Sequence, residues 1–321
     1  MKETVVDIPP KCISGLEFGA LSAADIVAQS EVEVSTRNLF DLEKGRVPVK
    51  NGALDTRMGI SSNSSECATC HGNLASCHGH FGHIKLALPV FHVGYFKAII
   101  QVLQTICKSC SSLLLDETTQ RQFLVELRRP GLDNLRRMKT LKKVVDRAKK
   151  QRRCLHCGSL NGVIKKAAAG SGPAALKIIH DTFRWIGKKG ADEKLEWDED
   201  FHKLFETNPD LEKFMKRCYD DLNPLKVLNL FKQIKPDDCE LLGIDPSKGG
   251  RPEMYIWRYL PAPPVCIRPS VVMSDSNTSN EDDLTVKLTE IVWTSSMIRA
   301  GIEKGITINS LMEQWDYLQL A

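Results

Sequence analysis

Cys67-Ala-Thr-Cys70-His-Gly-Asn-Leu-Ala-Ser-Cys77-His-Gly-His80 is the most informative stretch of this 321-residue chain. It supplies three thiols and one imidazole as two short pairs, and each pair can wrap one side of a tetrahedral ion. Zinc suits four such soft ligands, and a site with four protein ligands has no open position for catalysis. The spacing therefore predicts a closed, structural zinc site with the ligands Cys67, Cys70, Cys77 and His80.

Four histidines lie in or beside this loop: His71, His78, His80 and His83. We assign His80 as the fourth ligand because it pairs with Cys77 through the same two-residue spacing that separates the cysteines of the first pair. The other three histidines are expected to have surface or supporting roles.

A second set of cysteines is split into two pairs, Cys107-x2-Cys110 and Cys154-x2-Cys157, with 43 residues between them. Two isolated pairs could instead be redox motifs, but such motifs normally accompany a βαβ pattern, and none is visible. The set therefore predicts a second structural zinc site with four cysteine ligands. The remaining cysteines have no paired spacing and are expected to be buried apolar residues; they are Cys12, Cys218, Cys239 and Cys266.

The composition, 42% hydrophobic and 26% charged, is that of a globular protein with room for two or three domains. No signal peptide and no apolar run of 18 residues is visible, so neither secretion nor membrane insertion is expected. Cysteine-ligated zinc also implies a reducing compartment.

Positive charge is concentrated in residues 101–190, which hold 20 Lys and Arg against 6 Asp and Glu, although the whole chain has a net charge of only +4. Within this region, residues 133–150 carry apolar positions at helical spacing and are expected to form a helix with a cationic face. Lys142, Lys143 and Arg147 are the candidate contacts to nucleic-acid phosphates. A solvated helix face or a nuclear-import signal would give the same pattern.

Other helices are expected at 91–106, 116–129 and 201–235, with one starting at the Asn223-Pro224 cap, and again from 283 onward. The proline-rich residues 259–270 should be extended, residues 271–283 a loop, and residues 187–200 a mobile linker. No nucleotide-binding glycine loop, catalytic triad or magnesium-binding carboxylate cluster is visible. The acids at 281–283 fit the start of a helix better than a catalytic site.

The sequence from Cys67 through Leu88-Pro-Val-Phe-His92 resembles the signature of the largest subunit of eukaryotic and archaeal RNA polymerases. Leu260-Pro-Ala-Pro-Pro264 and Asn280-Glu-Asp-Asp-Leu284 are similar to segments of the same subunit. Among the nuclear enzymes, the segments Arg152-Arg-Cys-Leu-His-Cys-Gly158 and Asn223-Pro-Leu-Lys-Val-Leu-Asn-Leu-Phe231 look most like RNA polymerase III.

This resemblance implies an α+β, mostly helical fold that forms the multi-part clamp of the polymerase around two structural zinc sites. Residues 1–95 would be the N-terminal part of the clamp core with the first zinc, and residues 96–234 the clamp head with the second zinc and the basic helix. Residues 235–321 would return to the core and carry a lid-like loop at 271–283, with Arg268 at its base as a further nucleic-acid contact.

The resemblance also implies a nuclear location and binding of template DNA and the RNA–DNA hybrid. The expected partners are the other RNA polymerase III subunits, above all the second largest, and the products are small non-coding RNAs such as tRNA and 5S rRNA. The family's magnesium-binding Asn-Ala-Asp-Phe-Asp-Gly-Asp motif is absent here, so we expect a chain truncated before the catalytic region and inactive alone. Magnesium would belong only to the full subunit. The alternative is a stand-alone, zinc-dependent nucleic-acid-binding or adaptor protein without polymerase activity.

Overall fold

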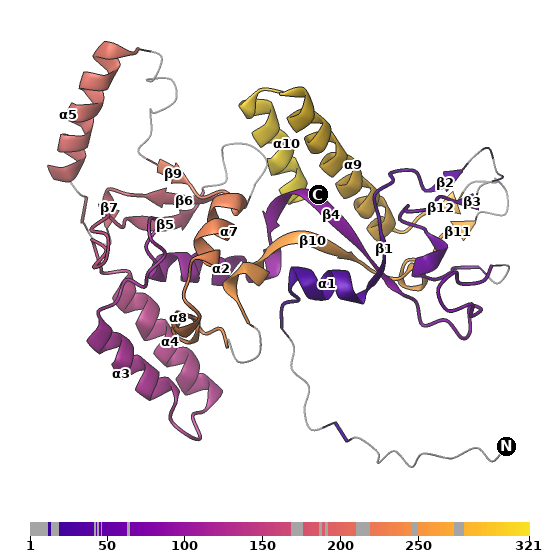
Figure 1. Cartoon of the computed structure of the whole chain (residues 1–321), viewed down its shortest axis with the longest axis horizontal. Helices are drawn as coiled ribbons and strands as arrows, with labels where there is room; N and C mark the ends of the chain where they lie inside the picture. Colours follow the sequence, from indigo (N-terminus) through magenta and orange to yellow (C-terminus); the bar gives the residue numbers. More distant parts are fainter. Residues whose placement is uncertain are drawn as a thin grey trace, which may run out of the picture.

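The computed structural model describes residues 12–13, 19–41, 43, 45, 47–62, 65–167, 176–185, 188–189, 192–209, 219–245, 250–272 and 279–321. Helices and strands are mixed along this part of the chain. Its apolar side chains gather into two buried clusters, which we call the core cluster and the head cluster. Strand β4 (Phe81–Phe91) runs through the middle of the molecule and connects the two (Figure 1).

The core cluster is organised by a three-stranded sheet in the order β1-β4-β10. Strand β1 (Ser30–Glu33) is parallel to β4, and β10 (Ile256–Ala262) is antiparallel to it. Because β10 is an edge strand, Pro261 is tolerated there without breaking an inner ladder. The cluster consists of buried residues from the sheet and the helices beside it, namely Val32, Val34, Ala53, Leu54, Met58, Ile84, Leu86, Val90, Ala262, Val265, Leu288, Val292, Ile298, Trp315 and Leu318.

Three helices cover this sheet. Helix α1 (Ala23–Gln29) packs on β10 and begins with a capping box between Ser22 and Asp25. Helices α9 (Asp283–Lys304) and α10 (Ile308–Leu320) form an antiparallel pair beside β4 (Figure 1). The turn between them begins at Gly305, whose φ of 67° is the left-handed conformation of a helix C-cap.

The head cluster begins where β4 ends. A 3-10 turn, η2 (Val93–Tyr95), leads into α2 (Phe96–Thr105), followed by the helix pair α3 (Glu117–Leu127) and α4 (Asn134–Ala148). A second sheet, in the order β5-β6-β9, contains β5 (Val163–Lys166), β6 (Ile178–Asp181) and β9 (Tyr219–Asp221). Helix α7 (Pro224–Lys232) and the short α8 (Pro236–Cys239) complete the cluster.

The remaining elements are short, except for one helix. Two-stranded pairs are formed by β2 (Phe40–Asp41) with β3 (Val47–Pro48), by β7 (Arg184–Trp185) with β8 (Lys188–Lys189), and by β11 (Val271–Val272) with β12 (Ser279–Asn280). Helix α5 (Asp192–Thr207) lies between β8 and β9 in the sequence. Further 3-10 turns are η1 (Thr56–Met58), η3 (Glu240–Leu242), η5 (Pro252–Tyr255) and η6 (Val265–Ile267).

Expected helices whose first residues carry a capping signal are confirmed. Asp116, Asp133, Asn223 and Asp282 are the N-caps of α3, α4, α7 and α9. The side chains of Asp116, Asn223 and Asp282 each accept a hydrogen bond from an N–H of the first turn. Asp282 and Asp283 therefore serve the start of α9, as expected, whereas Glu281 accepts a hydrogen bond from the Ser270 hydroxyl.

Five other expectations are wrong in part. The helix expected from residue 91 starts at Phe96, because Phe91 still belongs to β4. The linker expected at 187–200 is largely α5, and the helix expected over 201–235 is interrupted by β9, while residues 210–218 lie outside the described residues. The segment expected as a loop at 271–283 begins and ends in the β11–β12 stem. Strand β10 ends at Ala262, and the extended backbone expected at 259–270 is interrupted by η6 at Val265–Ile267.

The two clusters meet near residues 91 and 256. The head cluster includes Phe91 at one end and Cys239, Leu241, Ile244 and Ile256 at the other. Cys239, Leu241, Ile244 and Ile256 therefore pack into the head cluster, although they follow residue 234. None of the helices in the described part of the chain combines the length and apolar composition needed to span a membrane.

Candidate metal centres and basic helix

The first cysteine-rich group brings together the four residues that its spacing selected. One donor atom each from Cys67, Cys70, Cys77 and His80 lies within 4.8 Å of all the others. Cys67 is buried, whereas Cys70 is exposed, so the group sits at the edge of the core. The Cys77 Sγ and the His80 Nε2 are 3.8 Å apart. These four residues could hold one metal ion.

This loop is hydrogen-bonded to the short turn η1. The Thr69 hydroxyl donates to the Arg57 carbonyl at 2.8 Å, and the His80 N–H donates to the Met58 carbonyl at 3.2 Å. Both halves of the loop are thereby fixed to the consecutive residues Arg57 and Met58, which holds the two ligand pairs facing each other.

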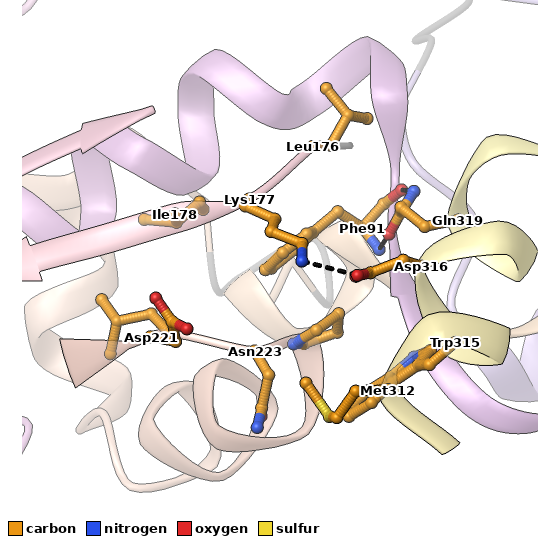
Figure 2. Close-up of a pocket in the computed structure, with 12 residues that line it drawn as sticks. Phe91, Leu176, Lys177, Ile178, Asp221, Asn223, Met312, Trp315, Asp316 and Gln319 are labelled. Atoms are coloured by element: carbon orange, nitrogen blue, oxygen red, sulfur yellow. Dashed lines mark hydrogen bonds and ion pairs between the residues drawn. The ribbon is translucent and has the colours of Figure 1, made fainter. Parts of the chain in front are cut away.

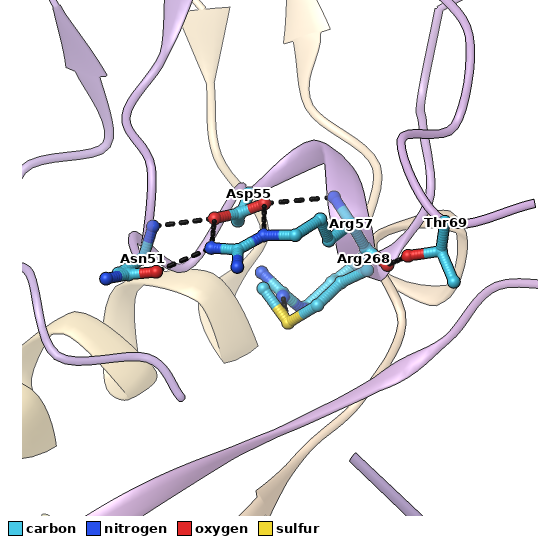
Figure 3. Close-up of polar contacts among 6 residues, drawn as sticks. Asn51, Asp55, Arg57, Thr69 and Arg268 are labelled. Atoms are coloured by element: carbon cyan, nitrogen blue, oxygen red, sulfur yellow. Dashed lines mark hydrogen bonds and ion pairs between the residues drawn. The ribbon is translucent and has the colours of Figure 1, made fainter. Parts of the chain in front are cut away.

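Turn η1 is itself braced by a buried carboxylate (Figure 3). Asp55 is 3% exposed and accepts hydrogen bonds from the Arg57 side chain and from the Asn51 N–H, the latter at 2.6 Å. Burial opposes ionisation of Asp55, but the hydrogen bonds from Arg57 and Asn51 outweigh it and lower the pKa of Asp55 below its usual range. The base of the metal-binding loop is therefore a satisfied ion pair, which favours a fixed geometry.

The second group joins two cysteine pairs that are far apart in the sequence. The donor atoms of Cys107, Cys110, Cys154 and Cys157 also lie within 4.8 Å of one another. The sulfurs of Cys110 and Cys154 are 3.6 Å apart, as are those of Cys107 and Cys157. Tetrahedral zinc with bonds of about 2.3 Å places its sulfurs about 3.8 Å apart, whereas a disulfide bond is about 2.05 Å long. The spacing therefore fits four ligands of one ion and not a pair of disulfides.

The three Cys-x-x-Cys turns share one backbone design. The N–H of the first cysteine bonds to the carbonyl five residues later in all three, with partners Gly72, Ser112 and Ser159. The residue after the second cysteine returns an N–H to the first cysteine, and its φ is positive: 56° at His71, 58° at Ser111 and 71° at Gly158. Each sequence thus forms the same tight turn and points both sulfurs to one side.

The two cysteines that start the turns of the second group also receive N–H groups on their sulfurs. Ser109 donates to the Cys107 Sγ and His156 to the Cys154 Sγ, each at 3.4 Å. In the first group, Gly79 donates to the Cys77 Sγ at the same distance. Such donors stabilise thiolates, which are the form that binds metal.

Burial opposes full ionisation of these cysteines. It raises the pKa of Cys107 and of Cys77, whereas the Ser159 hydroxyl and N–H lower the pKa of Cys157. Several thiolates within one small volume repel each other, so they need a cation to be ionised together. A divalent metal ion would supply that charge at both groups.

Lys108 lies between the two cysteines of the first pair in the second group, and its ammonium donates to the Ile106 carbonyl at 2.8 Å. Burial lowers the pKa of Lys108 to about 8, while the nearby Cys107 and Cys154 thiolates oppose the shift. This lysine was not selected from the sequence, where it is one of many cations. Because Lys108 lies beside the sulfurs, its positive charge would offset part of the negative charge of four thiolates.

The basic residues of α4 lie as expected on its outer side. Lys142, Lys143 and Arg147 are exposed, and Lys143 forms an ion pair with Glu126 of α3 at 3.4 Å. Among the described residues, neither Lys142 nor Arg147 has an ion-pair partner. The buried face of α4 is narrower than expected, because Leu135 and Met138 are each 68% exposed and only Thr140, Val144 and Ala148 are fully buried.

The expected nucleic-acid contact at Arg268 is contradicted by its position. The side chain has 0% exposure and bonds to protein atoms at all three nitrogens. A guanidinium enclosed in the core cannot reach a phosphate group. Its proximity to the β11–β12 stem was foreseen, but its burial also depends on packing against Met58 of η1 and Thr285 of α9, which the sequence does not reveal.

The residues set aside from the two groups lie in varied places. His71 and His78 are exposed, and the His83 ring lies 2.6 Å from the Ser30 hydroxyl, so none is among the grouped donors. Cys239 is buried as expected, but Cys12 and Cys266 are exposed, and Cys218 lies outside the described residues.

Known proteins resemble this chain over nearly its whole length. Residues 10–321 match the family described as RNA polymerase Rpb1, domain 1. The DNA-directed RNA polymerase III subunit RPC1 of Debaryomyces hansenii is 76% identical over all of this chain, and that of Homo sapiens is 42% identical over 97% of it. The DNA-directed RNA polymerase subunit Rpo1N of Methanocaldococcus jannaschii is 30% identical over 97% of the chain. This chain spans only 20–22% of the length of these relatives.

Proposed function

This chain belongs to the RNA polymerase Rpb1 domain 1 family, and from that membership we propose that it is the clamp portion of the largest subunit of DNA-directed RNA polymerase III. High identity to RPC1 proteins of both yeast and human supports the class III assignment. The polymerase is a nucleotidyltransferase of the nucleus that makes small non-coding RNAs such as tRNA and 5S rRNA.

Both cysteine-rich groups hold zinc in this proposal. Seven of the eight donors are sulfur, which favours zinc over the hard cations magnesium and calcium. Four protein donors at each site leave no position for substrate, so the ions are structural. The ligands are Cys67, Cys70, Cys77 and His80 in the first site and Cys107, Cys110, Cys154 and Cys157 in the second.

The transfer chemistry lies outside this chain. Within the part of the chain that the structure describes, the groups able to hold a metal ion are these two, and neither offers the carboxylate oxygens that magnesium requires. What the chain contributes is shape and charge: it holds DNA and RNA while residues elsewhere in the polymerase carry out nucleotidyl transfer with magnesium.

The chain is divided as a clamp in this proposal. Residues 1–95 and 235–321 form the clamp core with the first zinc, and residues 96–234 form the clamp head with the second. The two separate buried clusters support this division, although the packing of Cys239 and Ile256 favours a boundary nearer to residue 256. Helix α9 turns Val286, Trp293 and Met297 to solvent, each at least 39% exposed, which supports burial against other subunits such as the second largest.

One observation carries the nucleic-acid proposal: Lys142, Lys143 and Arg147 lie exposed on a single helix within the region of net positive charge. Positions 143 and 147 are four residues apart and so share one face, with 142 adjacent. A row of cations on a rigid helix can contact successive phosphates of template DNA without reading its sequence.

We expect the triple variant Lys142→Gln, Lys143→Gln, Arg147→Gln to bind DNA with a weaker dependence on salt. Each lost phosphate contact should reduce the slope of log affinity against log salt by about 0.9 for duplex DNA. Titrating assembled polymerase with labelled duplex DNA at several salt concentrations measures the slope. The matched control removes three exposed cations elsewhere, Lys97, Lys235 and Lys304. Equal slopes for the α4 variant and the unmodified enzyme would contradict the assignment of α4 to phosphate binding.

A further inference from the structure

Arg268 is a buried cation without a carboxylate partner among the described residues. Its Nε donates to the Pro263 carbonyl at 3.0 Å, and its Nη1 donates to the Thr285 hydroxyl at 3.1 Å. The third nitrogen, Nη2, is 3.8 Å from the Met58 sulfur. Burial lowers the pKa of Arg268 to about 10, so this environment disfavours the charge. The charges of Asp282 and Cys266 oppose this shift but do not cancel it. A buried cation that bonds to no carboxylate is costly, which points to a geometric role for the guanidinium fork.

The Met58 contact leads directly to the first metal-binding loop. The Met58 carbonyl accepts the His80 N–H at 3.2 Å, so Met58 contacts the backbone of a ligand on one side and Arg268 on the other. A Cβ added at Gly82 would lie 2.6 Å from the Met58 sulfur, which shows how tightly the methionine is held.

A second contact joins the same two segments. Gly79, between the ligands Cys77 and His80, has a φ of 83° and packs against the chain just before Arg268. A Cβ there would lie 2.5 Å from Pro264 and 2.6 Å from the Cys266 sulfur. Only glycine permits both this backbone conformation and this close approach.

On its other side, Arg268 reaches the base of the β11–β12 hairpin. The Ser270 hydroxyl donates to the Glu281 carboxylate directly below the first rung of the hairpin, in which Val271 pairs with Asn280. Thr285, which accepts the Nη1 bond, is in the first turn of α9, three residues after the N-cap that follows the hairpin. Strand β11 therefore begins three residues after Arg268, and β12 is followed by Thr285, which is hydrogen-bonded to Arg268.

We propose that Arg268 is a positioning residue that couples the first metal-binding loop to the base of the β11–β12 hairpin. The fork holds three segments at once: η1 through Met58, the proline segment through Pro263, and α9 through Thr285. The orientation of the hairpin then depends on the metal-binding loop, although no ligand of the metal lies in the hairpin. This consequence rests on the proposed function: for the lid-like loop that the family resemblance implies at 271–283, the coupling sets the orientation of the stem.

The coupling is tested by hydrogen exchange of assembled polymerase without nucleic acid. We expect Arg268→Gln to speed amide exchange in the stem residues 271–272 and 279–280 about tenfold, while the α3–α4 helices change less than about twofold and both zinc ions remain. Arg268→Lys keeps the charge but loses the fork and should give an intermediate rate. Arg258→Lys, at an exposed arginine of β10, is the matched control. Unchanged stem exchange in Arg268→Gln overturns the proposal, and so does an equal rise throughout the molecule.

A double-variant cycle separates coupling from mere loss of support. Cys70→Ser removes the first metal site and should itself speed stem exchange. If Arg268 transmits the effect, the double variant Cys70→Ser, Arg268→Gln exchanges no faster than the faster single variant; fully additive effects overturn the proposal. Because no DNA is present, failure here leaves the proposed function intact. An unchanged salt slope for the α4 variant would contradict the phosphate contacts without touching Arg268.

Discussion

Each cysteine pair is set by a turn of six residues that forms its own hydrogen bonds. The carbonyl of the first cysteine accepts an N–H from the residue after the second, and that residue adopts a positive φ. Glycine does so freely at position 158, whereas His71 and Ser111 do so with some backbone strain. A metal ion that binds both pairs of a group would offset this strain, which makes the turns depend on the metal.

Cys110→Ser should therefore remove one of the two zinc ions and leave the other. Structural zinc contributes on the order of 10 kcal/mol to the folding of small sites, so the loss should also unfold the turn at 107–112. Metal analysis of purified polymerase, corrected for zinc bound by other subunits, gives the stoichiometry. Cys12→Ser, at an exposed cysteine outside both groups, is the control. Retention of both ions in Cys110→Ser would refute the ligand assignment.

His180 makes the stability of the head depend on pH. Its side chain is buried in β6, and its Nε2 accepts the Gly162 N–H at 3.1 Å. Burial lowers the pKa of His180 to about 4, with further lowering by Lys108 and Lys226 and opposition from Asp220. In the unfolded chain the same imidazole has a pKa of about 6.5. Between these values only the unfolded state binds the proton, so acid favours unfolding.

The head should thus lose stability as the pH falls from about 6.5 to about 4, by at most about 3 kcal/mol from this residue. Above pH 6.5 the residue should have no effect, because both states are neutral. His180→Gln removes the titration while keeping an acceptor for Gly162. Opening free energies from hydrogen exchange in β5 and β6 should be less dependent on pH in this variant. Acid would also release metal from the unmodified protein and from the variant. The informative quantity is therefore the difference between their opening free energies at each pH. Identical pH profiles would refute the assignment of this pH dependence to His180.

Among the secondary-structure elements, α10 is attached to the end of β4 by side-chain hydrogen bonds. These bonds pair backbone groups of β4 that no neighbouring strand reaches. The Gln319 amide pairs with both backbone groups of Phe91, accepting its N–H at 2.6 Å and donating to its carbonyl at 3.0 Å (Figure 2). The Trp315 indole donates to the Pro89 carbonyl at 2.8 Å. The last residues of β4 are thus paired on a side where no strand reaches them, as buried backbone requires.

Gln319→Glu should weaken this junction by about 1–3 kcal/mol. The carboxylate can still accept the Phe91 N–H, but it cannot donate to the Phe91 carbonyl, which is left unpaired beside a negative charge. The local free energy of opening, measured by hydrogen exchange of the Phe91 amide, reports the loss. Gln233→Glu, at an exposed glutamine that ends α7, is the control. An unchanged Phe91 exchange rate would show that the helix is held by packing alone.

Helix positions were predictable from caps, but helix faces were less so. Asp116, Asn223 and Asp282 could be identified because an N-cap acts on its own first turn and needs no distant partner. The face of α4 could not, because Leu135 and Met138 match the apolar spacing yet extend beyond the surface that α2, α3 and η3 cover. The interruption at β9 was missed for a similar reason: its three residues form a strand only because β6 offers an edge.

Across the whole molecule, the head and core clusters meet at a junction around the end of β4 (Figure 2). A small cavity of about 50 Å³ lies there, lined mainly by apolar side chains of both clusters. Beside it, Lys177 before β6 forms an ion pair with Asp316 of α10 at 2.5 Å. This pair bridges the two clusters, so it can restrain their relative orientation.

A double-mutant cycle on Lys177→Met and Asp316→Asn should give a coupling energy of about 0.5–1 kcal/mol. The value is small because the two side chains are 43% and 29% exposed and solvent screens their charges. Opening of α10, followed by hydrogen exchange at low and high salt, should show the coupling at low salt and its loss at high salt. The charge-swapped variant Lys177→Asp, Asp316→Lys should recover part of it. A coupling of zero at low salt would mean that packing alone orients the head.

By itself, the sequence determined which residues form each cysteine-rich turn and most helix starts, because each depends on residues a few positions apart. The pairing of Cys107-x2-Cys110 with Cys154-x2-Cys157 also followed, since four thiolates need one shared ion and no other cysteine pair was available. Only the tertiary structure decided that Arg268 is buried. The residue stands beside a polar segment in the sequence, yet Met58, Pro263 and Thr285 enclose it from three separate segments. Burial is a property of how segments pack together, and no local pattern encodes it.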